Sequence, residues 1–247
     1  MALALLADLH GNLTALEAVL EDMSRFDIES VLCLGDVANF GPQPQATLRR
    51  LRNLEPDIVL GNTDAYLLKP RTLKDVTAPD DNTDFFLAVE AWSAEQLEAS
   101  DRAYIRTFQK TVRLEVAGLN ILAYHGSPKS YDDPVRAGTP DEVLDGFFEG
   151  ETADLYLGAH THEQFVRRYH TARVMNPGSV GNSFVIAADG RAFNYPIAEY
   201  ALLDVLHGEP NLTFRRVTYD AEAYVASIRE SGMPFQDRML EDFKPQP

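Results

Sequence analysis

Short apolar runs alternate with amphipathic stretches in the first part of the chain. Residues 3–6, 28–34 and 58–60 are apolar runs of the length of short buried strands. Residues 13–20 carry apolar side chains at helical spacing, and residues 44–51 begin with a proline that suits the first turn of a helix. This alternation predicts parallel β-α-β crossovers, with the connections lying on the faces of a sheet.

The pattern changes in the second part of the chain. Residues 69–84 are polar and predict a loop, residues 85–98 and 102–108 predict helices, and residues 112–124 predict a hairpin. Later strands, most of them antiparallel, are expected at 153–157, 165–169, 172–175, 183–187, 200–205 and 212–217, with helices at 140–148 and 220–231. We therefore expect an α/β fold, a two-sheet mixed β-sandwich flanked by helices. It would form a single domain over residues 1–247, with a helical segment at about 84–108 and a loosely held C-terminal tail.

Composition narrows the class of protein. The 247 residues include 22 basic and 38 acidic side chains, a net charge of −16. Such a surface offers no general basic patch, so duplex nucleic acid is not an expected partner. The early apolar stretch at residues 2–7 is far shorter than the ~20 residues of a membrane helix and lacks the basic flank of a signal peptide. Cys33 is the only cysteine, so no internal disulfide forms and a cytoplasmic protein without a membrane partner is expected.

Histidines and acids gather at the ends of the predicted strands. In open α/β sheets, sites form in the crevice beyond the carboxyl ends of the strands. Seven donors fall there at five strand ends: Asp8, His10, Asp36, Asn62, His125, His160 and His162. Carboxylate, imidazole and amide donors without a thiolate suit ions such as Mn²⁺, Fe or Zn²⁺. Seven donors exceed one tetrahedral shell and suit two ions about 3.5–4 Å apart, bridged by a carboxylate and a water.

The local sequences around these residues point to a known family. The chain reads DLHGN at 8–12, GD at 35–36, GNTD at 61–64, HGS at 125–127, GAHTH at 158–162 and NPGSVG at 176–181. In this order the motifs resemble the calcineurin-like metallophosphoesterases, and more closely the small bacterial and archaeal phosphodiesterases of that superfamily. The resemblance runs from residue 3 to about residue 205, except for residues 65–110, whose role stays open.

The resemblance implies a four-layer fold and a ligand set. The first metal would take Asp8, His10, Asp36 and His162, and the second Asp36, Asn62, His125 and His160, with Asp36 as the bridge. Two divalent ions are implied, with Mn²⁺ favoured and Fe, Zn²⁺, Ni²⁺ or Co²⁺ left open. The implied activity is hydrolysis of phosphodiester or nucleotide phosphate bonds in a small phosphate ester, through a hydroxide that bridges the metals. Asn12 would contact a phosphate oxygen or orient its loop.

One position departs from the family pattern. Many members carry a histidine after the motif asparagine, where it protonates the leaving group, and here Thr63 takes its place. A hydroxyl is a poor general acid near pH 7, so the identity of the general acid is unknown. The alternative function is a catalytically weak binding or scaffold protein on the same fold. The physiological substrate, the native metal and homo-oligomerisation stay open.

Residues beyond the seven donors carry weaker signals. Phe40, Tyr66 and Tyr131 follow motifs on loops, where they would either wall a pocket for a base or aryl group or simply pack. His170 and His207 are expected to be surface histidines. Cys33 lies within a strand and is expected in the core.

Overall fold

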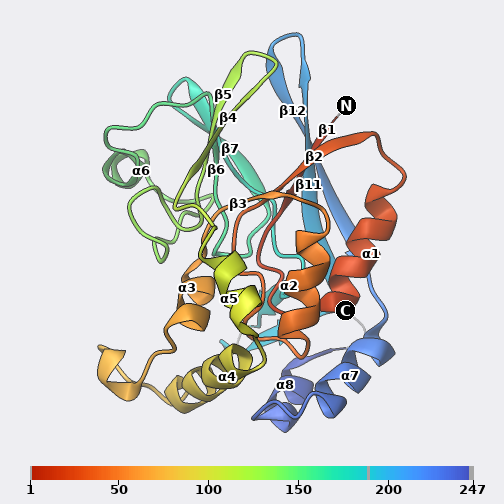
Figure 1. Ribbon diagram of the computed structural model, residues 1–247. Coiled ribbons are helices and arrows are strands. Elements are labelled where there is room, and N and C mark those ends of the chain that lie inside the picture. The colour runs from red at the N-terminus through yellow and green to blue at the C-terminus, as the bar shows by residue number, and fades with distance from the viewer. Residues whose placement is uncertain (1, 188–189, 245–247) are drawn as a thin grey trace.

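Two five-stranded sheets form the centre of the protein (Figure 1). The computed structural model describes residues 2–187 and 190–244. The first sheet has the order β12-β11-β1-β2-β3, built from β1 (Ala2–Leu6), β2 (Ile28–Cys33), β3 (Asp57–Ile58), β11 (Ile197–Leu206) and β12 (Glu209–Thr218). The second has the order β4-β5-β6-β8-β7, built from β4 (Val112–Val116), β5 (Leu119–Ala123), β6 (Leu155–Leu157), β7 (Phe165–Tyr169) and β8 (Ala172–Asn176).

Both sheets are mixed, as expected for the sandwich. In the first sheet β1 lies between β2, to which it is parallel, and β11, to which it is antiparallel. In the second sheet β6 is parallel to both β5 and β8, while β4 and β7 are antiparallel to their neighbours. A separate antiparallel hairpin consists of β9 (Phe184–Ile186) and β10 (Ala192–Asn194).

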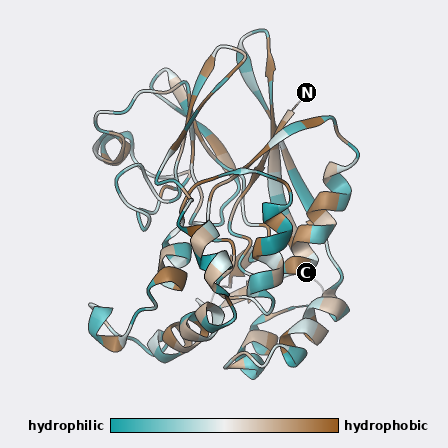
Figure 2. Cartoon of the chain, viewed as in Figure 1, coloured by the Kyte–Doolittle hydropathy of each residue, from teal (hydrophilic) through white to brown (hydrophobic). Residues whose placement is uncertain are grey.

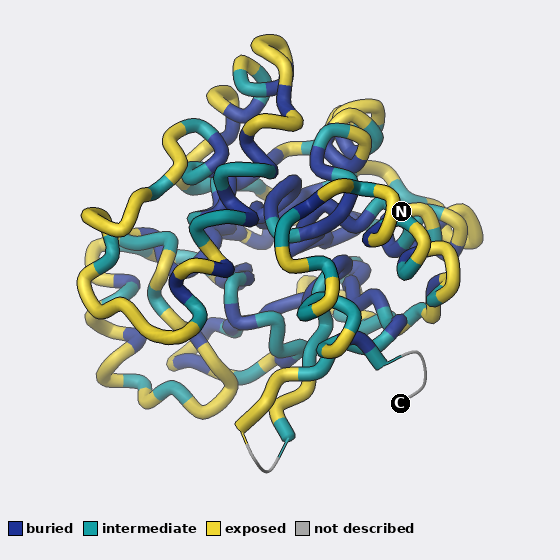
Figure 3. The backbone as a smooth tube through the Cα atoms, turned by 90° about the horizontal axis from the view of Figure 1, so that it is seen from below, coloured by how far each residue is buried: buried dark blue, intermediate teal, exposed yellow. Residues whose placement is uncertain are grey.

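The alternation of side chains along β1 shows why the sheets stack. Leu5 points between the two sheets, where it packs in one apolar cluster with Ile121 and Leu157. Leu6 points the other way, into the cluster that includes Leu16 on the covering helices. Strands buried on both faces need such continuous apolar runs. Figure 2 shows brown segments along these strands, and Figure 3, viewed from below, shows buried segments surrounded by exposed ones.

Helices cover the outer faces and complete four layers. The α-helices are α1 (Leu13–Met23), α2 (Pro44–Arg52), α3 (Asn62–Leu68), α4 (Thr83–Glu95), α5 (Ala99–Ile105), α6 (Asp141–Phe147), α7 (Ala221–Glu230) and α8 (Gln236–Asp242). Leu144 of α6 packs with Tyr124 on the outer face of the second sheet. Among the described residues, no helix has the length and apolar character that a bilayer crossing needs.

The structure adds elements that the sequence pattern did not predict. The third strand ends at Ile58, earlier than expected, and α3 begins directly at Asn62. The predicted loop 69–84 contains a short 3₁₀ helix at Leu73–Asp75. The C-terminal tail, expected to be loosely held, contains α8, and its last residues 245–247 lie outside the described part of the chain.

Candidate metal centre

Five loops bring the seven predicted donors together at one end of the sheets. Asp8 and His10 follow β1, Asp36 follows β2, and Asn62 is the first residue of α3. The other three are supplied by the second sheet, with His125 after β5 and His160 and His162 after β6. The site therefore lies across the carboxyl ends of strands from both sheets, where crevices form in α/β proteins.

The backbone of these loops is unusual. Asp8, His10, Asp36, His160 and His162 all have positive φ, between 44° and 67°. Residues other than glycine rarely adopt this left-handed conformation, and it persists where the surrounding structure imposes it. Five of the seven candidate positions therefore share a backbone conformation that the surrounding structure has to hold in place.

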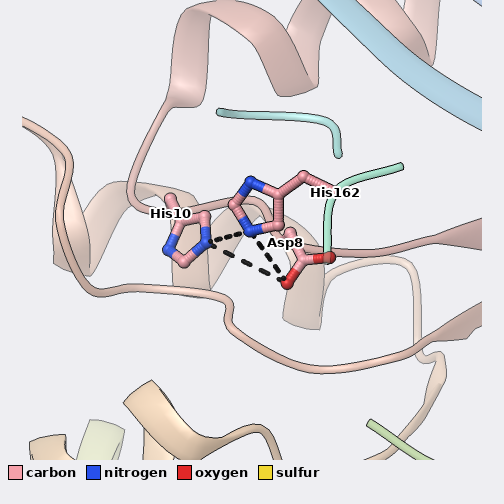
Figure 4. Close-up of side chains that lie close together, drawn as sticks. All are labelled: Asp8, His10 and His162. Atoms are coloured by element: carbon pink, nitrogen blue, oxygen red, sulfur yellow. Dashed lines mark hydrogen bonds and ion pairs between the residues drawn. The ribbon is translucent and has the colours of Figure 1, made fainter. Parts of the chain in front are cut away.

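One group of donors comprises Asp8, His10 and His162 (Figure 4). The Nε2 atoms of His10 and His162 lie 3.1 Å apart. Asp8 Oδ1 is 3.5 Å from His162 Nε2 and 4.0 Å from His10 Nε2. Three ligand atoms, from two buried residues and the half-buried His162, thus converge on one small volume, as a metal site requires.

A second group comprises Asp36, His125 and His160. His125 Nε2 is 3.4 Å from Asp36 Oδ2 and 3.0 Å from Asn62 Oδ1. Asp36 Oδ2 is also 3.9 Å from His10 Nε2, so this carboxylate lies between the two groups. Its other oxygen, Oδ1, accepts a hydrogen bond from the backbone N–H of Thr63 at 2.9 Å.

Backbone carbonyls orient three of the histidines. The Nδ1 atoms contact the carbonyl oxygens of Asn39, Leu34 and Asn182, at 3.2 Å for His10, 2.7 Å for His125 and 2.7 Å for His162. A ring that donates from Nδ1 presents an unprotonated Nε2, which is the form that binds metals. All three Nε2 atoms face the site.

The site holds buried carboxylate charge that the neighbouring histidines compensate only in part. Neither oxygen of the Asp8 carboxylate, which is buried, has a hydrogen-bond partner among the described residues. Burial and the neighbouring His162 together lower the pKa of His10 to about 4. Burial alone would also lower the pKa of His125, but the Asp36 carboxylate raises it to about 10. A divalent cation would displace the proton that the carboxylates hold on His125 and would place positive charge beside these buried carboxylates.

The Asp64 side chain joins two segments of the site by hydrogen bonds, a role that the sequence pattern did not predict. Its carboxylate accepts hydrogen bonds from the backbone N–H groups of Asp36 at 2.8 Å, Val37 at 2.9 Å and Gly61 at 3.1 Å. Burial and the nearby charge of Asp36 raise the pKa of Asp64 to about 7. The only sequence signal was its place at the end of the GNTD motif. The three bonds join the loop after β2 to the start of α3.

Two polar residues of the motifs have contrasting surroundings. Asn12 is buried, accepts a hydrogen bond from the Ala15 N–H at 2.9 Å and donates one to the Gly181 carbonyl at 3.0 Å. It caps α1 and joins the first loop to a later one, which leaves its amide little capacity for a phosphate. The Thr63 hydroxyl is also buried, yet it has no partner among the described residues.

A cleft of about 420 Å³ opens beside the donors. It is lined by His10, Asp36, Asn62, Thr63, His160 and His162 together with aromatic side chains. Of the three loop aromatics predicted as pocket walls, Phe40 lines this cleft, whereas Tyr66 and Tyr131 do not. His170 is exposed and pairs with Asp145 away from the donors, and His207 lies in the turn between β11 and β12.

The fold and the clustered donors define a metal-binding α/β protein with its site at the strand ends. Residues 1–207 match the family model of the calcineurin-like phosphoesterase superfamily domain. The chain therefore belongs to this superfamily, which confirms the resemblance seen in the motifs and implies divalent metal ions.

Known proteins align with nearly the whole of this chain. "Uncharacterized protein MJ0912" from Methanocaldococcus jannaschii is 27% identical over 251 residues, covering 94% of this chain and 93% of the relative. The crystal structure of a metallophosphoesterase from Sphaerobacter thermophilus has a TM-score of 0.72 at 24% identity, covering 98% of both chains. That of the hypothetical protein PH1004 from Pyrococcus horikoshii OT3 has a TM-score of 0.78 at 21% identity, covering 95% of both chains. These two structures support the fold.

Proposed function

We propose that this protein is a two-metal phosphoesterase that hydrolyses phosphodiester or nucleotide phosphate bonds. The position of Asp36 carries the proposal, because one carboxylate oxygen lies 3.9 Å from His10 Nε2 and 3.4 Å from His125 Nε2. A carboxylate between two histidine groups suits a pair of metal ions better than a single one.

The ligands of each ion follow from the two groups. Asp8, His10, Asp36 and His162 would hold the first ion, and Asp36, Asn62, His125 and His160 the second. A donor set of carboxylates, imidazoles and an amide suits Mn²⁺, Fe and Zn²⁺. The family resemblance favours Mn²⁺ and leaves Fe, Zn²⁺, Ni²⁺ and Co²⁺ as alternatives. Bound divalent ions supply charge for phosphoryl oxygens and lower the pKa of a water that serves as nucleophile.

The residues of the chain prepare the site for this chemistry. Backbone carbonyls fix the histidine rings, and Asp64 fixes the loop that carries Asp36. Thr63 lines the same cleft and its hydroxyl has no partner among the described residues, so it would donate a hydrogen bond to a bound phosphoryl group rather than protonate a leaving group. The net charge of −16 repels phosphates, so substrate attraction depends on the metal centre.

The rival function is a binding or scaffold protein that keeps the fold without catalysis. All seven donor positions carry side chains able to bind metal, which favours the enzyme. Metal analysis combined with hydrolysis of bis(p-nitrophenyl) phosphate separates the two. We expect about two metal equivalents per chain and metal-dependent hydrolysis.

Asp36→Asn tests the proposed role of this carboxylate directly. It removes the charge that both ions would share, so metal content and hydrolysis should both fall, with activity reduced by orders of magnitude. His170→Ala, a substitution of an exposed histidine outside the site, should leave both unchanged. Hydrolysis that persists in Asp36→Asn, or none in the metal-loaded native chain, would refute the proposal.

A further inference from the structure

The cleft beside the donors continues along an aromatic wall. The ring centroid of Phe40 lies 6.0 Å from that of His10, and the Phe86 ring packs edge-on against Phe40 at 5.4 Å. On the other side, the Phe184 ring lies 5.3 Å from that of His162. Aromatic faces therefore border the candidate ligands on two sides, and Phe86 is 41% exposed although it is a large apolar residue.

Three segments that surround the cleft come from distant parts of the chain. Phe86 lies on α4, Phe184 lies on β9, and α8 contributes Arg238 and Met239. Arg238 lies over the Phe85 ring at 4.3 Å and donates a hydrogen bond to Asn82 Oδ1 at 2.6 Å, which ties α8 to the start of α4. Figure 1 shows these two helices side by side below the strand ends.

The same cleft contains an unpaired polar atom. Asn194 on β10 lines it, and its Oδ1 atom is buried without a hydrogen-bond partner among the described residues. A buried acceptor without a partner is unfavourable, so its presence in a cleft indicates a place for a ligand donor. Aromatic rings beside an unpaired acceptor match a flat heterocycle that carries N–H groups.

We infer that this aromatic half of the cleft is a subsite for the nucleobase of a nucleotide substrate. The base would stack on the exposed ring of Phe86, with Phe40 and Phe184 bordering the same space. It would donate an N–H to Asn194 Oδ1, while its phosphate lies at the metal centre. This inference rests on the proposed function, because it needs a phosphate at the donors. A volume of about 420 Å³ lies within the range of small-molecule sites.

Two other occupants agree less well with these features. An alkyl substituent would fill the volume but gain nothing from flat ring faces and would leave Asn194 unpaired. A plain aryl group would stack equally well but would also leave the Asn194 acceptor without a donor. The nucleobase is the substituent that uses both features.

Equilibrium binding to the metal-loaded protein tests the inference without turnover. The ligands are the four nucleoside 5′-phosphonates, ribose 5-phosphonate and phenylphosphonate, whose P–C bonds resist hydrolysis. Stacking of a base on an aromatic side chain strengthens binding by about tenfold or more. We expect the tightest nucleoside compound to bind at least about tenfold better than ribose 5-phosphonate and better than phenylphosphonate. Equal affinity for the nucleoside and ribose compounds would overturn the subsite, and equal affinity for phenylphosphonate would overturn the choice of a nucleobase.

Substitutions show which residues cause the preference for the nucleoside phosphonate. Phe86→Ala should weaken the nucleoside compound by about tenfold and leave ribose 5-phosphonate unchanged. Phe26→Ala is the matched control, because Phe26 is also a partly exposed phenylalanine, 36% exposed, but lies outside the cleft. Asn194→Ala should reduce the preference for the nucleoside compound over phenylphosphonate. Unchanged nucleoside affinity in both cleft variants would overturn the inference.

Failure of this inference and failure of the proposed function give different results. If the protein hydrolyses aryl phosphodiesters but binds nucleoside and ribose phosphonates equally, the proposed function stands and the base subsite is refuted. If it prefers nucleoside phosphonates but hydrolyses no phosphoester, the base subsite stands and the proposed enzymatic function is refuted.

Discussion

The Asp64 carboxylate accepts a hydrogen bond from the backbone N–H of Asp36 at 2.8 Å, and so holds the residue that lies between the two donor groups. The same carboxylate accepts from Val37 and Gly61. One side chain therefore binds three backbone N–H groups from two segments of the site, which makes Asp64 a positioning residue for the candidate metal ligands.

Asp64→Asn should therefore weaken metal binding with the fold retained. The amide presents N–H groups toward backbone N–H donors, so at least one of the three hydrogen bonds is lost. Loss of groups that orient metal ligands lowers metal affinity by about 10–100-fold. Competition with a chelator measures the affinity, and circular dichroism checks the fold. Asp220→Asn is the control, because Asp220 also accepts a backbone N–H, that of Ala223, but does so at the start of α7. Equal losses in both variants would contradict the assigned role.

Gly61→Ala should disrupt the site by a steric clash, without a change in charge or hydrogen bonding. A Cβ atom at this position would lie 2.0 Å from Asp36 Oδ1 and 2.5 Å from the Asp36 nitrogen. Neither atom has room to move, because Oδ1 binds the Thr63 N–H and the nitrogen binds Asp64. We expect the purified variant to contain less metal than the native chain, as measured by elemental analysis.

Gly146→Ala is the matched control for this substitution. A Cβ at Gly146 in α6 would meet no atom within 4 Å, and alanine in a helix interior is favoured over glycine by about 0.5–1 kcal/mol. The control should keep its metal and unfold at slightly higher denaturant concentration. If Gly61→Ala also keeps its metal, the close contact with Asp36 does not set the geometry of the site.

The reaction rate should depend steeply on the leaving group. Thr63 stands where many family members carry a histidine, and a positioned general acid is worth about 10²–10⁴-fold. Aryl diesters and nucleoside polyphosphates should thus react faster than alkyl monoesters. The measurement is log kcat/KM against leaving-group pKa for the native chain and Thr63→His. The variant should gain rate for alkoxide leaving groups and little for nitrophenolate. A flat plot for the native chain would mean that another group donates the proton.

Acid should destabilise the protein through Asp22. Burial would raise the pKa of this carboxyl, but hydrogen bonds from Tyr200 at 2.7 Å and from Arg215 at 2.8 and 2.9 Å outweigh burial and lower it. A lowered pKa contributes stability above the unfolded value of about 3.9, and this stability is lost as the pH falls through the folded value. Asp22→Asn should lower the free energy of unfolding at pH 7 by about 2 kcal/mol.

Urea denaturation at several pH values checks this prediction. The difference between the native chain and Asp22→Asn should be largest at pH 7 and shrink as the pH falls below about 4. Tyr200→Phe removes one of the hydrogen bonds and should show a smaller effect of the same sign. A difference that does not change with pH would exclude ionisation of Asp22 as its source.

The sandwich could be predicted from the sequence because its central strands are apolar on both faces. Apolar runs such as residues 3–6 are buried on both faces, and a strand of this kind requires a layer on each side. The clustering of the seven candidate donors was also predictable, since each lies within a few residues of a strand end and these strand ends meet at one edge. The structure brings all seven together.

Other features depend on contacts that the local sequence does not show. Residues 61–64 have the composition of a turn, yet Asn62 begins α3 because the Asp64 side chain accepts the Gly61 N–H. The aromatic wall joins Phe86 to Phe184 across nearly a hundred residues, and the segment around Phe86 matched no motif. Periodicity predicts elements, but it does not predict which loops share a cleft.

The order of the strands has a consequence for the newly synthesised chain. Strand β1 is made first, yet it lies in the middle of its sheet and pairs with β11, near the end of the sequence. The group of donors that contains Asp8 is likewise incomplete until His162 has been synthesised. A nascent fragment that ends before His162 therefore has neither a finished first sheet nor a complete set of ligands. Both metal sites can form only after the second half of the chain has been synthesised.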